Sequence, residues 1–444
     1  MTIHSLLVTL LLLVLAYLSS FGTNKDRRGS KQAIQGITGD GLIKLWRRMD
    51  FRTRKRIVIG KGGRVKIGAL NSLVVFGPTR CGKTSSVLIP MLCNFDGSAV
   101  VTSVKNDVFT NSHAARSLRS KTLVISEYEG DRGWRWDPAD YAKDLPAARE
   151  VAHHMVISSN EYRNSSGDAK FWYRLAEPLL TGVLLASCTA DSLDERKVLC
   201  NFEDLDFLLN RLDSIGEQDL TQSILGVLRN DERHASSVLI TAQSVLSPHL
   251  QALELLHDAS FDLDLHDVLH NRSTDPFTIY LIASLSSQER LAPYFGTIIS
   301  LIGATLLREE HVRCGVLFAL DELANVAPVS DLAKFASVGM SFGLQMVSVF
   351  QDFAQIRNVC GDSAGTVVNN HGTKIFFGGI TDPSTLELFR SIRPLEEKTG
   401  VRNWPDVSEL RFGEALVLEP FRAPSKIRLL RRSSTKEGKK FTFG

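Results

Sequence analysis

Residues 73–92, LVVFGPTRCGKTSSVLIPML, decide the fold of this chain. Four apolar residues, Leu73 to Phe76, predict a buried strand. Residues Gly77 to Thr84 then fit the pattern G-x-x-x-x-G-K-[ST] at every fixed position. After this turn the apolar residues recur at helical spacing. Strand, glycine-rich turn and helix in that order indicate a phosphate-binding loop, because backbone N–H groups at a helix N-terminus bind phosphate.

The loop predicts a nucleotide substrate and a role for each of its polar residues. We expect Lys83 to bind the β- and γ-phosphate oxygens, and the Thr84 hydroxyl to ligate Mg²⁺. The expected substrate is therefore ATP with Mg²⁺. The residues predicted to contact the nucleotide are Gly77, Pro78, Thr79, Arg80, Cys81, Gly82, Lys83, Thr84 and Ser85.

A second stretch, VLFALDELANV, predicts the acidic half of the same site. Val316 to Leu320 is an apolar, strand-like run that ends in Asp321 and Glu322. We expect Asp321 to hold Mg²⁺ and Glu322 to act as general base on the attacking water, or to orient it. An acid pair at a helix N-terminus has the same letters, so the pattern is weak without the glycine loop.

A third strand, Leu344 to Phe350, stops at Gln351. In RecA-like ATPases a polar residue at this place senses the γ-phosphate, and a solvated glutamine in a turn is the alternative. The predicted catalytic residues are therefore Lys83, Glu322 and Gln351, and the predicted metal ligands are Thr84 and Asp321.

The pattern along the chain predicts an α/β core of the RecA-like P-loop type with an all-α insertion. Residues 139–270 show helical periodicity almost throughout, whereas strand-like runs lie on both sides of them. We expect a mostly parallel sheet with helices on both faces. Beyond the strands already named, the predicted ones are Ser98–Thr102, Lys121–Tyr128, Phe277–Ala283, Lys374–Gly379 and Glu414–Pro420.

The N-terminus contains an uncharged apolar run, SLLVTLLLLVLAYLSSF, within residues 3–21. About 20 such residues can span a bilayer. No Lys or Arg precedes the run, while basic residues follow from Lys25, which favours a single-pass anchor with the bulk of the chain in the cytoplasm. A cleaved signal and a buried helix are the alternatives.

Charge is distributed unevenly, although the net charge is only +3. Residues 1–70 contain 14 Lys and Arg against 3 Asp, and residues 421–444 contain 8 against 1 acidic residue, so the middle is acidic. A basic front end beside an apolar run suggests anionic lipid, and nucleic acid must meet a local basic patch or a channel. The predicted organisation is a transmembrane anchor at 1–24, a basic juxtamembrane linker at 25–55, a nucleotide-binding domain at 56–138 and 271–428, an all-α domain at 139–270, and a basic tail at 429–444.

Together these stretches resemble the type IV secretion coupling proteins, the TraG/TraD-type ATPases of bacterial conjugation. GPTRCGKTSSVLIPML and VLFALDELANV resemble the two nucleotide-binding motifs of that family, and SVFQDFAQIRNVCG resembles its glutamine motif. DAKFWYRLAEPLLTGVLLAS is similar to the signature that opens the family's all-α domain, and NNHGTKIFFGGITDPSTLELF resembles the segment after the glutamine motif.

The resemblance implies an ATPase anchored in the bacterial inner membrane that assembles as a homo-hexamer with nucleotide between subunits. It also implies export of DNA, single-stranded with bound relaxase, through channel components of a type IV secretion system. The turn that holds an arginine finger in some members reads Gly339-Met340-Ser341-Phe342-Gly343 here, so Arg290 and Arg233 are substitutes to consider. An FtsK/HerA-like DNA translocase, and a docking receptor that binds nucleotide without motor activity, are the alternatives.

Overall fold

The structure is a computed structural model, and it describes residues 60–61, 72–165, 167, 169–190, 192–200, 202, 204–229, 231–308, 315–327, 329, 331–392, 406–420, 424–429, 431–432 and 441–442. Two compact units divide the chain at residue 55, and every described residue belongs to the second, Arg56–Gly444. The predicted anchor at 1–24 and the linker at 25–55 lie outside the described residues.

A ten-stranded sheet forms the centre of this unit, with the order β1-β12-β11-β10-β2-β9-β8-β3-β7-β4. All pairs from β10 to β4 are parallel, and the three pairs from β10 to β1 are antiparallel. In this order the strands are Gly60–Lys61, Ser425–Leu429, Glu414–Leu418, Thr373–Phe377, Leu73–Phe76, Leu344–Phe350, Val316–Leu320, Ser98–Ser103, Phe277–Ile282 and Lys121–Ser126.

The mostly parallel sheet predicted from the sequence is confirmed. The predicted strands differ from the observed ones by at most two residues at either end, and β2, β8 and β9 match at both ends. The strand β12 was not predicted. Its alternation of exposed and buried residues, in Ser425–Leu429, is the period of an outer strand with one covered face, but it is only five residues long.

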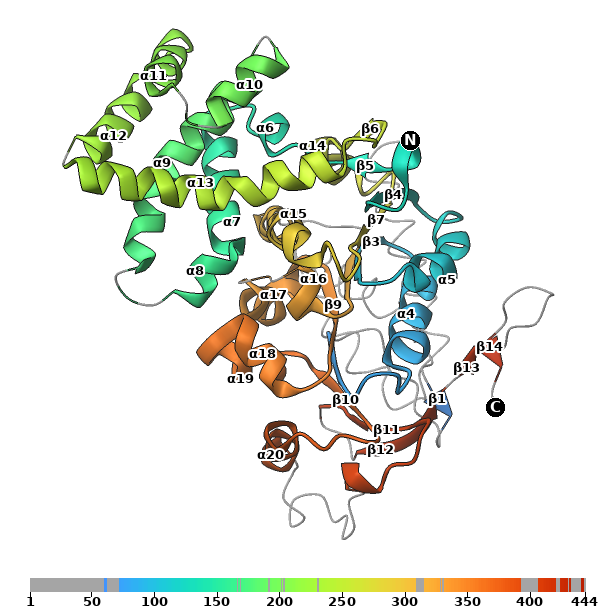
Figure 1. Ribbon diagram of the computed structural model, residues 1–444. Helices are drawn as coiled ribbons and strands as arrows, with labels where there is room; N and C mark the ends of the chain where they lie inside the picture. Colours follow the sequence, from blue (N-terminus) through green and yellow to red (C-terminus); the bar gives the residue numbers. More distant parts are fainter. Residues whose placement is uncertain are drawn as a thin grey trace, which may run out of the picture. The chain divides into compact units, whose positions relative to one another are not determined.

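Helices cover both faces of the sheet, as Figure 1 shows. The chain from β2 enters a π-helical turn, η1, and then α4, which together with α5 packs on one face through Val87, Leu92 and Val108. The other face lies against helices that follow β7, β8, β9 and β10 in the chain. These elements are η1 (Thr84–Leu88), α4 (Ile89–Asn94), α5 (Asp107–Arg116), α15 (Gln288–Arg308), α16 (Leu323–Val326), α17 (Leu332–Val338), η3 (Gly339–Phe342), α18 (Phe353–Cys360), η4 (Gly361–Ser363), α19 (Ala364–Asn370) and α20 (Pro383–Ile392).

Between β4 and β7 the chain is almost entirely helical. Aspartate is the N-cap residue of several of these helices. The Asp144 side chain accepts a hydrogen bond from the Ala147 N–H, and the Asp204 side chain accepts one from the Phe207 N–H. The helices are α6 (Pro138–Tyr141), α7 (Leu145–Ser158), α8 (Asn160–Asn164), α9 (Ala169–Cys188), α10 (Leu193–Cys200), α11 (Leu205–Ser214), α12 (Gln218–Leu228), α13 (Glu232–Leu255) and α14 (Leu265–Asn271). The short elements are η2 (Gly130–Arg132), η5 (Val407–Glu409), β5 (Trp134–Arg135) paired with β6 (Phe261–Asp262), and β13 (Arg431–Arg432) paired with β14 (Phe441–Thr442).

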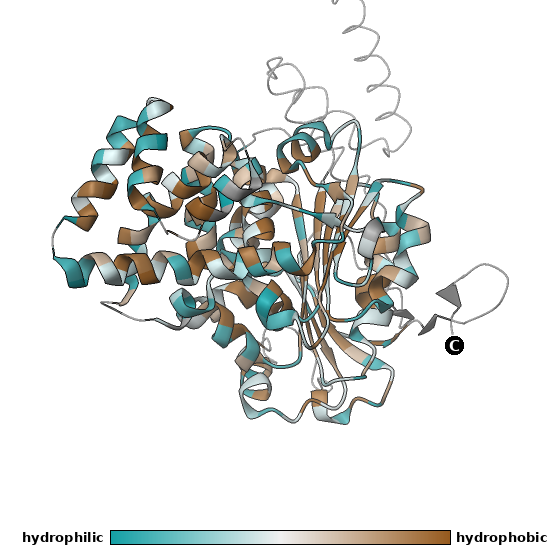
Figure 2. Ribbon diagram, turned by 45° about the horizontal axis from the view of Figure 1, so that its top comes forward, coloured by the Kyte–Doolittle hydropathy of each residue, from teal (hydrophilic) through white to brown (hydrophobic). Residues whose placement is uncertain are grey.

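Helix α15 joins the helical insertion to the sheet, because it packs on both α7 and α13. Among the described residues it is also the one helix that is long and apolar enough to cross a membrane. However, 78% of its most apolar stretch is buried inside the unit. Its apolar residues form the interior of the unit, in agreement with Figure 2, where the sheet and the helix surfaces next to it are brown and the outer surfaces are largely teal.

Because His371 is buried, we expect this unit to lose stability in mild acid. Nδ1 of His371 lies 2.7 Å from the Val367 carbonyl oxygen and therefore carries a proton, and Nε2 lies 3.0 Å from the Ser348 hydroxyl. Burial lowers the pKa of His371 to about 4. An unfolded histidine has a pKa of about 6.5. The folded unit is therefore fully stable, as far as His371 is concerned, above that pH, and it loses free energy of unfolding as the pH falls toward 4, because the unfolded chain then binds a proton that the folded one does not. We expect His371 alone to lower the free energy of unfolding by up to about 3 kcal/mol over this pH range.

The measurement is the urea midpoint of unfolding at pH 7.5 and at pH 5, for the wild type and for His371→Gln. The variant should be less stable at pH 7.5 and should lose less stability between the two pH values. Asp321 titrates with the opposite sign, since its pKa is raised, but its contribution cancels in the comparison of the two proteins. An equal loss in both proteins would contradict the assignment to His371.

Candidate functional site

The phosphate loop lies at the carboxyl end of β2, in the middle of the sheet. A Cβ atom on Gly77 would lie 2.8 Å from the Phe377 Cβ and 2.9 Å from the Cys81 Sγ, so no larger residue fits at the start of the loop. Arg80 (φ 61°) and Gly82 (φ 98°) are both left-handed. Left-handed residues interspersed with right-handed ones turn successive backbone N–H groups toward one concave side, which is the geometry of an anion nest.

Lys83 is folded into this loop. Its side chain is almost entirely buried, and Nζ donates hydrogen bonds to the Gly77 oxygen at 2.6 Å and to the Pro78 oxygen at 2.8 Å. The ammonium is therefore held among the backbone groups that form the loop. A phosphate oxygen that entered the loop would meet this charge without a large movement of the side chain.

Thr84 and Asp321 meet directly, although they are 237 positions apart in the chain. The Thr84 hydroxyl donates a hydrogen bond to the Asp321 Oδ2 at 2.8 Å. Thr102, at the end of β3, donates to the backbone oxygen of Asp321 at 2.9 Å and so anchors that residue from the neighbouring strand. The two motifs predicted from the sequence thus form one site.

The charge around Asp321 suits a divalent cation. Burial is the main cause that raises the pKa of Asp321 to about 6. The nearby carboxylates of Glu322 and Asp107 act in the same direction, and the Thr84 hydroxyl and Lys83 act against it. Two further carboxylates and one ammonium thus act on the Asp321 carboxylate. A hydroxyl and carboxylates are ligands that Mg²⁺ prefers, so Thr84 and Asp321 fit the cation predicted from the sequence.

Replacing Asp321 by asparagine should therefore have opposite effects on stability and on ligand binding. The melting temperature of the ligand-free protein should rise, because a buried charge that costs roughly 1–3 kcal/mol is removed. In contrast, the dissociation constant of ATP in Mg²⁺ should increase about tenfold or more, toward its value in EDTA. Calorimetric titration with and without Mg²⁺ measures this, and an unchanged Mg²⁺ dependence would exclude Asp321 as a ligand.

Glu322 has a strained backbone at the start of helix α16. Its φ of 47° and ψ of 40° lie in the left-handed region, which costs a residue with a side chain roughly 1–3 kcal/mol. Within the described part of the chain, no hydrogen bond to its carboxylate is present. Strain of this size at a residue beside the Asp321 carboxylate is typical of functional positions.

Gln351 lies between the two halves of the site. Strand β9 is placed between β2 and β8, and Phe350 is paired with Phe76, so Gln351 and Gly77 leave the sheet side by side. The backbone N–H of Gln351 donates to the Gln355 Oε1 at 2.8 Å, which connects the end of the strand to helix α18.

Of the loop residues predicted to contact the nucleotide, Thr79 and Arg80 are exposed, and the Ser85 hydroxyl donates a hydrogen bond to the Gly82 oxygen at 3.3 Å.

The turn Gly339–Gly343 lies at the opposite end of β9 from Gln351. Seven residues of strand separate the two, or about 20 Å, so this turn cannot serve the site of its own chain. Arg290 lies near the start of α15 and Arg233 near the start of α13. Among the described residues, neither side chain forms a hydrogen bond or an ion pair with the loop. Sequence reasoning missed Thr102, because a threonine inside a strand has no distinguishing pattern.

Comparison with known proteins assigns the family. The model of type IV secretory system conjugative DNA transfer proteins matches residues 42–392. The chain belongs to this family. Its similarity to individual members of the conjugative DNA transfer family is low but extends over most of the chain.

Conjugal transfer protein TraG of Escherichia coli is 21% identical over 315 residues, which are 64% of this chain and 49% of the relative. Protein VirD4 of Agrobacterium fabrum is 21% identical over 334 residues, or 72% and 49% of the two chains. The chain spans about half the length of the curated relatives that it matches. Among solved structures, plasmid coupling protein TrwB in complex with ADP and Mg²⁺ has a TM-score of 0.67 and 18% identity over 89% of this chain and 95% of that chain, which shows the same fold.

Proposed function

We propose that this protein is an ATPase that couples ATP hydrolysis to the export of DNA through a type IV secretion channel. The single observation that carries the proposal is the contact of Thr84 with Asp321, which brings the phosphate loop and the acid pair into one site. Membership of the conjugative DNA transfer family supports DNA as cargo. TrwB, which has the same fold, was observed with ADP and Mg²⁺ and with a non-hydrolysable ATP analogue.

The geometry suggests how the residues divide the reaction. Lys83 exchanges its bonds to the loop oxygens for bonds to the β- and γ-phosphates. Thr84 and Asp321 hold Mg²⁺, which neutralises charge on those phosphates when bound. Glu322, beside Asp321, orients or deprotonates the attacking water. Gln351 contacts the γ-phosphate from the strand between the two motifs and transmits its loss to α18 through Gln355.

The Glu322→Gln variant distinguishes a motor from a docking receptor that only binds nucleotide. Glutamine keeps the shape of the side chain and removes the base, so ATP binding should persist while hydrolysis falls by about a hundredfold or more. Plasmid transfer from a deletion strain carrying this variant should fall with hydrolysis. Normal transfer by a variant that does not hydrolyse ATP would show a receptor instead.

The remaining parts of the proposal concern the surroundings of the ATPase. Residues 1–24 anchor the chain once in the bacterial inner membrane, six copies assemble, and the cargo is single-stranded DNA with its bound relaxase. The anchor is supported by the apolar run and the basic residues that follow it. Cell fractionation tests it, because a soluble mature chain that begins near residue 24 would contradict a membrane anchor.

A further inference from the structure

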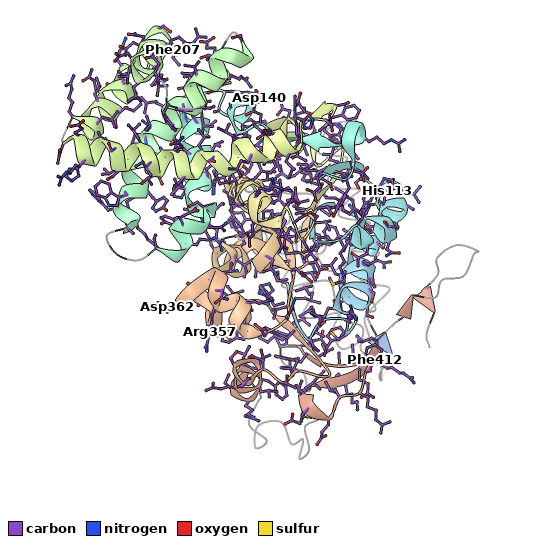
Figure 3. All side chains as sticks on the ribbon, in the orientation of Figure 1. His113, Asp140, Phe207, Arg357, Asp362 and Phe412 are labelled. Atoms are coloured by element: carbon purple, nitrogen blue, oxygen red, sulfur yellow. The ribbon has the colours of Figure 1, made fainter. Side chains whose placement is uncertain are left out.

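The carboxyl edge of the sheet has a second crevice of the kind that forms the ATP site. At the ATP site the chain leaves β2 toward α4 on one face, and it leaves the neighbouring β9 toward α18 on the other. Strands β3 and β7 are also neighbours, and they lead into α5 and α15 on opposite faces (Figure 1; Figure 3 labels His113 on α5). Where adjacent parallel strands lead to opposite faces, a crevice opens outside their carboxyl ends, and ligands bind there. The two crevices are three strands apart, or about 14 Å.

A hollow of about 550 Å³ lies at this second crevice. Three loops line it, one from the end of each of the last three strands of the sheet. Lys105 and Asn106 follow β3, Ser284 to Ser286 follow β7, and Tyr128 follows β4. The volume is in the range of ligand pockets, and the lining combines an aromatic ring, an amide, hydroxyls and one ammonium.

The walls of the hollow are tied to one another. The Ser284 N–H donates a hydrogen bond to the Glu127 Oε1 at 3.2 Å, which joins the loop after β7 to the loop after β4. The Tyr128 N–H donates to the Ser126 hydroxyl at 3.2 Å, and the hydroxyls of Ser284 and Ser286 lie 2.7 Å apart. The hollow is therefore formed before a ligand arrives, and little ordering is required on binding.

The groups that could hold a ligand here are free. The Tyr128 side chain is 55% exposed and Leu285 is 71% exposed. Among the described residues, the Tyr128 ring stacks on no other ring, and neither its hydroxyl nor the Lys105 Nζ has a hydrogen-bond partner. The carboxylates of the same loops are already in use, because Glu127 accepts the bond described above and Asp107 accepts one from the next backbone N–H at 2.8 Å. An open aromatic face beside a free ammonium is the combination that stacks a base and binds the adjoining phosphate.

We propose that this hollow binds one nucleotide unit of single-stranded DNA, with the base stacked on Tyr128 and the adjoining phosphate on Lys105. This inference rests on the proposed function, because single-stranded DNA is the cargo proposed above. A duplex cannot use the site in the same way, since its bases are stacked inside the helix and do not reach Tyr128. Stacking uses the face of the base, so the site should accept DNA of any sequence.

Fluorescence anisotropy of a labelled oligothymidylate gives the dissociation constant for the full-length protein, in ADP and Mg²⁺ so that the phosphate loop is occupied. We expect Tyr128→Ala to weaken binding about 5- to 100-fold, since a stacked base contributes that much to affinity in alanine substitutions, and Tyr128→Trp to retain it. Lys105→Ala should make the slope of log affinity against log salt shallower by about 0.7, the value for one phosphate contact to a single strand.

Phe171→Ala is the matched control, because it removes a ring that is 53% exposed from helix α9 in the helical insertion. This variant should bind the oligonucleotide as the wild type does. The proposal is overturned if Tyr128→Ala keeps the affinity of the wild type, or if Phe171→Ala is weakened equally. It is also overturned if thymidine monophosphate binds as tightly as the oligonucleotide, because the ligand would then be a free nucleotide. These outcomes leave the ATPase standing, whereas a wild type that does not hydrolyse ATP would overturn the proposed function itself.

Discussion

In the Lys83→Ala variant the rate of ATP hydrolysis is expected to fall by at least about a hundredfold, and plasmid transfer should be lost with it. Lys83 is the charged group inside the phosphate loop, where its ammonium is bound to the Gly77 and Pro78 oxygens. Since phosphoryl transfer depends almost entirely on positioning and on neutralising charge on the phosphates, removal of this ammonium removes the main cationic side chain of the loop. Purified protein with a coupled phosphate assay gives the rate.

A loss of activity caused by unfolding must be separated from a loss of catalysis. The melting temperature and circular dichroism of Lys83→Ala should match the wild type within a few degrees, because alanine leaves the loop backbone in place. Lys121→Ala is a suitable control, because this exposed lysine lies at the start of β4 and has no predicted role in the chemistry. Full transfer of a mobilisable plasmid by Lys83→Ala would exclude the motor.

The Arg116→Met variant is expected to lose roughly 3–5 kcal/mol of stability, which is a large part of the total for most domains. Arg116 is fully buried at the end of α5. Its guanidinium donates to the Phe95 oxygen, to the Gly97 oxygen at 2.6 Å and to the Thr278 hydroxyl at 2.9 Å. Methionine fills much of the space but takes the guanidinium donors away from the buried Phe95 and Gly97 carbonyl oxygens, at about 1–3 kcal/mol each, whereas the Thr278 hydroxyl keeps its hydrogen bond to Ser120.

Urea denaturation measures this loss, and Arg119→Met is the matched control. Arg119 lies in the turn that follows the end of α5, its side chain is 36% exposed, and it forms an ion pair with Asp96 at 3.4 Å. An exposed pair of this kind contributes at most about 1 kcal/mol. Similar urea midpoints for the two variants would show that Arg116 does not hold the segment between α4 and β3.

Much of the site could be predicted because its residues belong to short patterns. Gly77 to Thr84 and Asp321–Glu322 each follow an apolar run that is typical of a strand, and in a parallel sheet the carboxyl ends of strands share one edge. Gln351 could be placed by the same reasoning. Thr102 could not, because threonine is common inside strands and nothing in the local sequence distinguishes this one.

The sequence by itself determined the phosphate loop, the acid pair and the alternation of strands and helices, because each depends on residues within about 20 positions of one another. Only the tertiary structure decided that β9 lies between β2 and β8, that Thr84 touches Asp321, and that Arg116 is buried. These features depend on which distant segments pair and pack. Such pairing minimises exposed apolar surface and unpaired polar groups over the whole unit, so no local window of the chain encodes it.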